Sequence, residues 1–242
     1  MPDTVMVKGC CGDVLINEEC GCAGGGFDNP YWDAVRDHVD LSGSLWGTPS
    51  VDGLGRYRSP SGELDVDRWV RESLKRTDYV KQYAWTITDP DTVAFVAEHS
   101  RWRLVDPMAG TGYWARVLAQ LAVDVAAYDL NPPAPDCEDN TWHRNVAAHS
   151  MVQQADAVES VVLHADRTLL LSWPPYGFDA CPILNAYKGC RVIYMGEDLG
   201  GCCGDDDMFE AFERDWVKVA EHVPVQWDGM HDVVHVYDRR GA

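Results

Sequence analysis

The stretch at 104–129 constrains the fold of this chain more than any other. It places a short apolar strand before a glycine-containing turn, then an amphipathic helix and a second apolar strand that ends at Asp129. Gly110 and Gly112 permit a sharp turn and a close approach to a ligand, where a side chain would collide. Strand, glycine turn, helix, strand and terminal acid are the first half of a nucleotide-binding crevice in a parallel α/β sheet.

Two classes of cofactor use this layout, and the glycine spacing distinguishes them. A dinucleotide site has the pattern G-x-G-x-x-G, whereas this chain has only Gly110-x-Gly112, followed by Tyr113 and Trp114. The residues Asp-Pro-Met-Ala-Gly-Thr-Gly at 106–112 instead resemble the first motif of class I S-adenosylmethionine (SAM)-dependent methyltransferases, and among them the amino-group methyltransferases. For this motif alone, a tight turn in some other α/β protein is the alternative.

A second motif lies in the latter half of the chain. The apolar run at 168–172 predicts a central strand buried on both faces, and Trp173-Pro174-Pro175-Tyr176 follows it. This ending resembles the Pro-Pro-Tyr motif of N6-adenine-type methyltransferases. The prolines have fixed φ and no N–H donor, so we expect their carbonyl oxygens to accept from a substrate amine and Tyr176 to stack on a planar substrate. These four residues are the predicted catalytic residues.

One position departs from the pattern of that family. Trp173 stands where the family has a polar acceptor just before the prolines, and Ser172 points to the opposite face of the strand. Main-chain oxygens alone would then hold the amine. The departure weakens the adenine interpretation and leaves methyl transfer intact.

The resemblance also implies which residues bind the cofactor. Asp129 is expected at the ribose diol of SAM, Asp156 near its adenine amino group and Tyr83 at its methionine end. Core packing is an equal alternative for Tyr83, and Asp156 also suits the N-cap of a helix at 157–165. The predicted cofactor-binding residues are Tyr83, Asp106, Met108, Ala109, Gly110, Gly112, Asp129, Leu130, Asp156, Ala157 and Ser172.

The same resemblance implies the fold class and a division of the chain. We expect an α/β, Rossmann-like class I methyltransferase domain. Its sheet should be mostly parallel and seven-stranded with antiparallel closing strands, and an N-terminal extension should precede it. Residues 1–26 are predicted to form a Cys- and Gly-rich leader, residues 27–82 a helical extension and residues 83–242 the methyltransferase domain.

Local patterns predict the elements around the two motifs. Asp89 or Asp91 is placed to cap a helix at 92–99, and the proline at position 90 suits a helix start. The run at 191–195 predicts a further strand. Other expected elements are helices at 33–39 and 64–81, a strand at 150–154, a helix that opens at Asp205 with Phe209, Phe212, Trp216 and Val219 on one face, and closing strands at 223–227 and 232–238 that meet at Gly229.

Charge limits the partners that the chain is expected to bind. With 20 Lys and Arg against 39 Asp and Glu, the net charge is −19. Tight binding of duplex DNA needs several phosphate contacts, so we do not expect it. Neither a signal peptide nor an apolar run of about 20 residues for a membrane span is recognisable. We therefore expect a cytoplasmic protein with no membrane partner.

The cysteines present a separate question. The chain has nine, and an odd number argues against a complete disulfide framework. Cys10, Cys11, Cys20 and Cys22 are weak candidates for one zinc ion, but their CC…CxC spacing matches no zinc ribbon. Free thiols in the leader are the favoured interpretation.

Three functions follow from these patterns. The first is methyl transfer from SAM to an amino nitrogen, with adenine of DNA or RNA slightly favoured. The second is methyl transfer to a small molecule or a protein side chain, and the third is a non-catalytic cofactor-binding module. The expected acceptor is planar and bears an amine: a single-stranded or flipped base, or a small molecule. Methyl transfer depends mainly on alignment, and no Ser–His–Asp pattern is recognisable.

Overall fold

A computed structural model of the chain describes residues 6–9, 12–15, 27–36, 39–40, 50–51, 61, 63, 65–67, 75–227 and 229–241. In the predicted leader it describes an antiparallel pair of strands, β1 (Met6–Gly9) and β2 (Gly12–Leu15). The four candidate zinc ligands, Cys10, Cys11, Cys20 and Cys22, lie outside the described residues. Within the described part of the chain, every helix is too short or too polar to cross a membrane.

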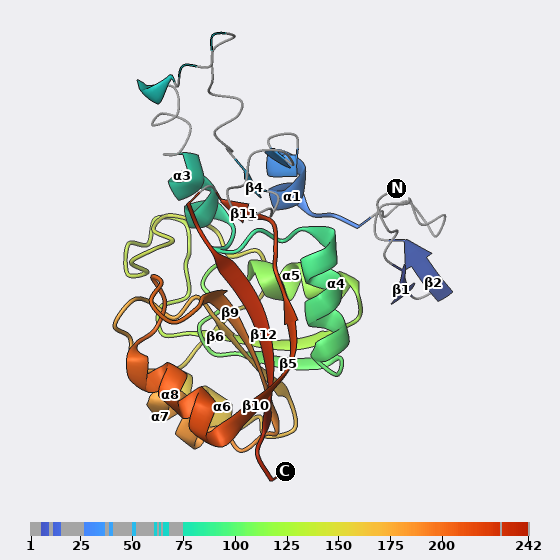
Figure 1. Ribbon diagram of the computed structural model, residues 1–242, viewed down its shortest axis with the longest axis vertical. Helices are drawn as coiled ribbons and strands as arrows, with labels where there is room; N and C mark the ends of the chain where they lie inside the picture. Colours follow the sequence, from blue (N-terminus) through green and yellow to red (C-terminus); the bar gives the residue numbers. More distant parts are fainter. Residues whose placement is uncertain are drawn as a thin grey trace.

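A seven-stranded sheet forms the centre of the molecule, in the order β10-β12-β9-β8-β5-β6-β7 (Figure 1). Its strands are β5 (Arg103–Asp106), β6 (Asp124–Asp129), β7 (Gln153–Gln154), β8 (Thr168–Ser172), β9 (Arg191–Glu197), β10 (Trp216–His222) and β12 (Asp232–Arg239). β12 is antiparallel to both of its neighbours, whereas the pairs from β9 through β7 are parallel. The predicted fold class, a mostly parallel sheet with antiparallel closing strands, is confirmed.

Helices cover both faces of this sheet. α4 (Pro90–His99) and α5 (Tyr113–Gln120) lie over one face, and α6 (Ala157–Val162), α7 (Cys181–Ala186) and α8 (Asp206–Asp215) lie over the other (Figure 1). Successive residues of a strand point to opposite faces, so Leu170 packs in the first layer while Leu169 and Leu171 pack in the second. All three are fully buried. The prediction of a central strand buried on both faces is confirmed.

The segment before the sheet packs against the first of these layers. Asn29 caps α1 (Pro30–Val35) by accepting from the backbone N–H of Trp32 at 3.2 Å. This cap and the proline at N1 explain why the helix begins before the predicted 33–39. Tyr31 and Val35 are fully buried in the same core cluster as residues of α4 and α5.

Two short strands of this segment belong to a second sheet. β3 (Val39–Asp40) pairs with β4 (Ser50–Val51), and β4 pairs in parallel with β11 (Gln226–Trp227) near the C-terminus. A helix was predicted at 64–81. Its C-terminal part is α3 (Lys75–Gln82), which lies next to the core. α4 begins at Pro90, two residues before the predicted 92–99, and its cap is Asp89, one of the two predicted caps, whose Oδ1 atom accepts from Thr92 N at 3.0 Å.

The secondary structure predicted for the C-terminal segment is wrong in two respects. α8 ends at Asp215, and Trp216 and Val219, which were expected on its apolar face, belong to β10. β10 then replaces 223–227 as the partner of β12, and β11 pairs with β4 instead. The spacing of the aromatic residues fits a longer helix, but main-chain pairing with β12 along β10 overrides that local preference.

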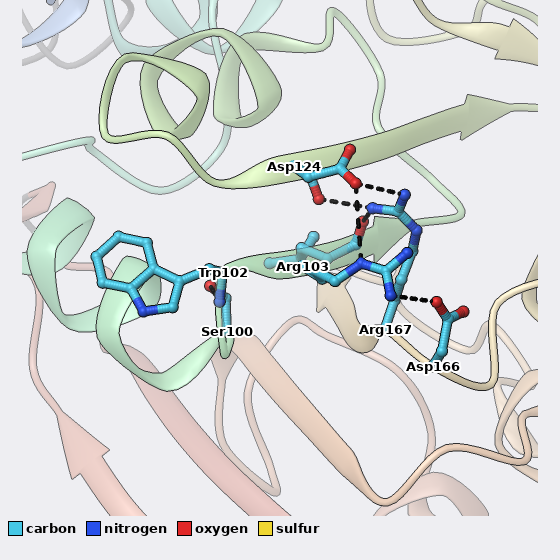
Figure 2. A network of polar contacts seen from close by, with 7 residues as sticks. Ser100, Trp102, Arg103, Asp124, Asp166 and Arg167 are labelled. Carbon is cyan, nitrogen blue, oxygen red and sulfur yellow. Dashed lines mark hydrogen bonds and ion pairs between the residues drawn. The ribbon is translucent and has the colours of Figure 1, made fainter. Parts of the chain in front are cut away.

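A polar network ties the amino ends of the central strands together (Figure 2). Arg167 lies just before β8, and its Nη2 donates to Asp124 Oδ2, at the start of β6, at 2.7 Å. Arg103, at the start of β5, pairs with Asp166 at 2.5 Å. The hydrogen bond from Arg167 lowers the pKa of Asp124. The exposed Arg103–Asp166 pair is worth at most about 1 kcal/mol. The network joins the strands at their amino ends, and the carboxyl ends are left for a site.

Asn29 connects the N-terminal segment to the core. Its side chain is 2% exposed, and Oδ1 accepts from the hydroxyls of Thr88 and Tyr113 at 2.9 Å each. We predict that Asn29→Ala lowers the free energy of unfolding by about 1–3 kcal/mol, because buried donors would lose their acceptor. Urea denaturation measures it. The matched control is Asp33→Ala, at an exposed ion pair with Arg36, and an equal loss in both variants would contradict the role of Asn29.

Candidate functional site

The topology of the sheet creates a crevice beside β5. β6 and β7 extend the sheet on one side of β5, and the chain then returns to place β8 on its other side. At such a switch point the loops after neighbouring parallel strands diverge and leave room for a ligand. A cavity of about 570 Å³ lies there, bordered by the turn after β5 and the segment after β8. This volume falls within the range of small-molecule sites.

The cavity brings together most residues that the sequence singled out. The predicted site residues that line it are Tyr83, Asp106, Met108, Ala109, Gly110, Asp129, Leu130, Asp156, Ala157, Ser172, Trp173, Pro175 and Tyr176. Gly112 and Pro174 are buried and lie outside the lining. Residues that sequence reasoning did not assign to the site also line it, among them Arg76, Trp85, Asn140, Trp142, His143 and Met230.

The glycine turn has the conformation that its residues require. Gly110 has φ +52°, and a Cβ atom there would lie 2.6 Å from Nε2 of His143. Gly112 has φ +69°, and a Cβ atom there would lie 2.4 Å from Oγ of Ser150. Both positions therefore need glycine for backbone conformation and for space.

Asp129, at the end of β6, lies beside this turn and bonds to its backbone. Its Oδ2 accepts from Gly110 N at 2.9 Å, and its Oδ1 accepts from Asn131 N at 2.9 Å. Burial raises the pKa of Asp129, and the two N–H groups oppose that shift. The carboxylate is thus oriented at the cavity wall by the backbone of both neighbouring loops.

Asp106, at the end of β5, is more deeply buried than Asp129. Its side chain is 2% exposed. Burial raises its pKa to about 7, against a 3.3 Å hydrogen bond from Met108 N, and the nearby charge of Asp129 raises it further. A carboxyl group with this pKa is part protonated at neutral pH.

His143 reaches the turn from a loop with no recognisable pattern. Its Nδ1 lies 2.8 Å from Lys81 O, so Nδ1 carries a proton and Nε2, beside Gly110, is an acceptor in the neutral ring. Burial lowers the pKa of His143, which favours that neutral form. No local motif marks His143 as a site residue, because Lys81 and Gly110 lie far from it along the chain.

Asp156 and Tyr83 each make the structural contact that was the alternative interpretation, and each also lines the cavity. Asp156 caps α6, its Oδ1 accepting from Val158 N at 2.8 Å and Glu159 N at 3.3 Å, and it also lines the cavity. The ring of Tyr83 stacks on Tyr31 with centroids 5.1 Å apart, and it too lines the cavity.

Trp173, directly after β8, forms part of the cavity wall. The backbone of Trp173 has φ +48°. Its indole Nε1 donates to Thr86 Oγ1 at 3.0 Å and to Asp232 Oδ2 at 3.2 Å. Its ring stacks on Trp85 at 4.8 Å, and Trp85 meets Trp142 edge-on at 5.2 Å. These contacts fix the indole of Trp173, which forms an aromatic surface together with Trp85 and Trp142.

The prolines that follow are held by the loop at 200–204. Pro174 O accepts from Gly204 N, and Pro175 O accepts from Phe178 N, both at 2.9 Å. Each carbonyl oxygen keeps a second lone pair. Tyr176 is 81% exposed at the cavity, so its ring is free to meet an incoming molecule.

Glu197, at the end of β9, fastens two loops near this end. Its side chain is nearly buried, with Oε2 accepting from Cys202 N at 2.8 Å and Oε1 accepting from His231 N at 2.9 Å. Burial would raise the pKa of Glu197, but these N–H groups outweigh it and lower the pKa. Among the described residues, no group of three or more His, Cys, Asp or Glu is arranged to hold a metal ion.

Comparison with known proteins gives likenesses of structure. No protein-family model and no curated protein matches the sequence. The 1,6-didemethyltoxoflavin-N1-methyltransferase of Burkholderia thailandensis, solved with bound 1,6-didemethyltoxoflavin and S-adenosylhomocysteine, is 15% identical with a TM-score of 0.43, over 73% of this chain and 92% of that one. TehB from Haemophilus influenzae is 13% identical with a TM-score of 0.42, over 68% and 67%. A methyltransferase from Geobacter sulfurreducens is 16% identical with a TM-score of 0.42, over 73% and 89%. Likenesses of this strength leave the function to be argued from this chain's own residues.

The buried carboxyl of Asp232 gives a pH-dependent prediction. Burial raises its pKa to about 6, against hydrogen bonds from Thr86 and Trp173. The pKa of Asp232 in the folded protein lies above its ordinary value. The protonated carboxyl therefore contributes its full stabilisation of the fold below about pH 4, and this contribution is lost as the pH rises through about 6. Asp232→Asn keeps an acceptor without the charge. The difference in free energy of unfolding, Asp232→Asn minus wild type, should rise by about 1.4 kcal/mol between pH 5 and pH 8. Urea denaturation at both pH values measures this, and a constant difference would refute it.

Proposed function

We propose that the chain is a SAM-dependent methyltransferase whose acceptor is a planar, amine-bearing molecule. One observation carries the proposal: the glycine turn after β5, Asp129 at the end of β6, and Trp173, Pro175 and Tyr176 after β8 line a single cavity at the switch point of the sheet. The turn and the segment after β8 carry the two motifs that resemble amino-group methyltransferases, which makes a coincidental tight turn a poor explanation.

In this proposal the cofactor occupies the end of the cavity near the glycine turn. Asp129 accepts from the ribose hydroxyls, Asp156 and Ala157 lie at the adenine, and Tyr83 lies at the methionine end. SAM supplies a methyl group made electrophilic by its sulfonium charge. Three carboxyl groups, Asp106, Asp129 and Asp156, line the cavity, and negative charge there favours a cationic cofactor.

The work of the protein is then alignment. Holding a nucleophile and a methyl group in near-attack geometry supplies about 7–11 kcal/mol. Trp173 and Tyr176 fix the plane of the acceptor, and the second lone pair of the Pro175 carbonyl accepts from its amine. The Pro174 carbonyl, which was predicted to share this role, is buried outside the cavity lining and bonded to Gly204 N. An amine loses its proton readily after methylation, so no strong general base is required.

The geometry favours a small-molecule acceptor over adenine in a nucleic acid. Among the described residues that line the cavity, Arg76 is the single Lys or Arg, whereas a nucleic acid is bound through several phosphate contacts. Trp173 is fixed as a wall by Thr86 and Asp232 and provides no side-chain acceptor for an adenine amine. The net charge of −19 also opposes a polyanion.

Cofactor binding tests the first half of the proposal. We predict that Asp129→Ala weakens the binding of S-adenosylhomocysteine by about 1.5–3 kcal/mol, the range for hydrogen bonds to a charged group. Isothermal titration calorimetry measures this affinity. Glu138→Ala, an exposed carboxylate in the loop that follows β6, is the control and should bind as the wild type does. Unchanged affinity in Asp129→Ala would refute the ribose assignment.

Tyr176 tests the second half. We predict that Tyr176→Ala lowers methyl transfer by about 1–3 kcal/mol of stacking energy, while its affinity for S-adenosylhomocysteine stays near that of the wild type. Transfer is followed with labelled SAM and fractionated cell extract, which also separates an enzyme from a non-catalytic module. Leu163→Ala, another exposed apolar residue, serves as the control. Parallel loss of cofactor affinity and transfer would make Tyr176 a packing residue instead.

A further inference from the structure

Arg76, on α3, brings an incompletely paired cation to the cavity. Its Nε and Nη2 atoms are buried and have no hydrogen-bond partner among the residues that the structure describes. These two nitrogens form one edge of the guanidinium group, the edge that binds a carboxylate through two parallel hydrogen bonds. Buried donors without partners are rare in folded proteins, and those on charged groups are the most costly. The arrangement therefore calls for a ligand.

Two tryptophans hold this guanidinium in place. The Cζ atom of Arg76 lies 5.5 Å from the ring centroid of Trp85 and 5.5 Å from that of Trp173. Cation–π attraction offsets part of the cost of the unpaired charge. The apolar rings also exclude water, and the lower local dielectric strengthens attraction to an anion.

Carboxyl groups lie near Arg76 as well as at the glycine turn: Asp232, whose raised pKa the charge of Arg76 opposes, has a buried Oδ1 atom without a hydrogen-bond partner among the described residues. Asp106 and Asp129 stand at the glycine turn, and Arg76 stands against Trp173. Its electrostatic neighbours agree with this place: burial raises the pKa of Asp232, a hydrogen bond to Glu197 raises that of Cys202, and the charge of Arg76 opposes both shifts. The cation thus lies at the end of the cavity assigned to the methyl acceptor.

We infer that the Nε–Nη2 edge of Arg76 binds a carboxylate of the methyl acceptor, which is therefore an aromatic acid. The assignment to the acceptor rests on the proposed methyl transfer. The aromatic part follows from the walls, where Trp142 and Tyr176 are exposed by 51% and 81% beside the stacked pair of Trp85 and Trp173. A single local cation recruits such an acid to a chain whose overall charge repels anions.

The test uses aromatic amines in matched charged and neutral forms. The probes are 2-, 3- and 4-aminobenzoate and the three corresponding aminobenzamides. Calorimetry and tryptophan fluorescence follow their binding to the full chain, with and without S-adenosylhomocysteine. We expect at least one aminobenzoate to bind about tenfold more tightly than its amide, as a bidentate charged pair requires. In Arg76→Gln this preference should disappear.

Two further variants separate charge from geometry. Arg76→Lys keeps the charge without the two-nitrogen edge, and most of the preference should be lost. Lys81→Gln removes an exposed cation from the same helix and should keep the preference intact. Thermal unfolding checks the fold of each variant. If Arg76→Gln does not fold, the comparison of Arg76→Lys with Lys81→Gln decides.

The outcomes distinguish this inference from the proposed function. Equal binding of every aminobenzoate and its amide by the wild type would overturn the inference. So would an Arg76→Gln variant that retains the preference, or one that loses affinity only for S-adenosylhomocysteine, since Arg76 would then hold the cofactor's own carboxylate. If the wild type bound no S-adenosylhomocysteine, methyl transfer would be rejected, while a preference for the acids would still place an anion at Arg76.

Discussion

Burial of β5 and β8 on both faces is the constraint on which the site depends. Leu104, Val105 and the three leucines at 169–171 are fully buried between two helix layers, so the connecting loops emerge only at the strand ends. The amino ends are joined by the Arg–Asp network around Asp124. The carboxyl ends, where β5 and β8 are neighbours at the switch point, are left to form the cavity.

Within the cavity, desolvation sets the charges. It raises the pKa of Asp106 to about 7 and that of Asp232 to about 6, and it lowers the pKa of His143. Each shift favours a neutral group in a place poorly reached by water. Asp129 is held by two backbone N–H groups and Arg76 by two aromatic rings. The cavity thus combines carboxyl groups of raised pKa at the ends of β5 and β6 with one guanidinium group, Arg76, held between tryptophan rings.

Trp173, the residue before the prolines, has a side-chain orientation and a backbone conformation that bear on what the cavity can bind. A polar side chain at that position would face a substrate amine, whereas Trp173 directs its indole N–H to Thr86 and Asp232 and presents a ring. Its φ of +48° is uncommon for such a bulky residue. The hydrogen bonds and the stacking on Trp85 compensate for that conformation. Trp173 therefore presents an aromatic surface to the cavity, and in the proposed function recognition of the acceptor depends on aromatic contact and on charge.

The sequence by itself determined the features that depend on neighbouring residues. The glycine turn needs positive φ at Gly110, the cap at Asp156 needs only the N–H groups of the next turn, and continuous apolar runs must be buried on both faces. Tertiary structure decided the rest. The segment from Trp216 became a strand because β12 offered main-chain partners, and His143 and Arg76 reached the cavity from segments without recognisable motifs. Their roles depend on contacts between residues far apart in the chain, and no local pattern of charge or hydrophobicity encodes such contacts.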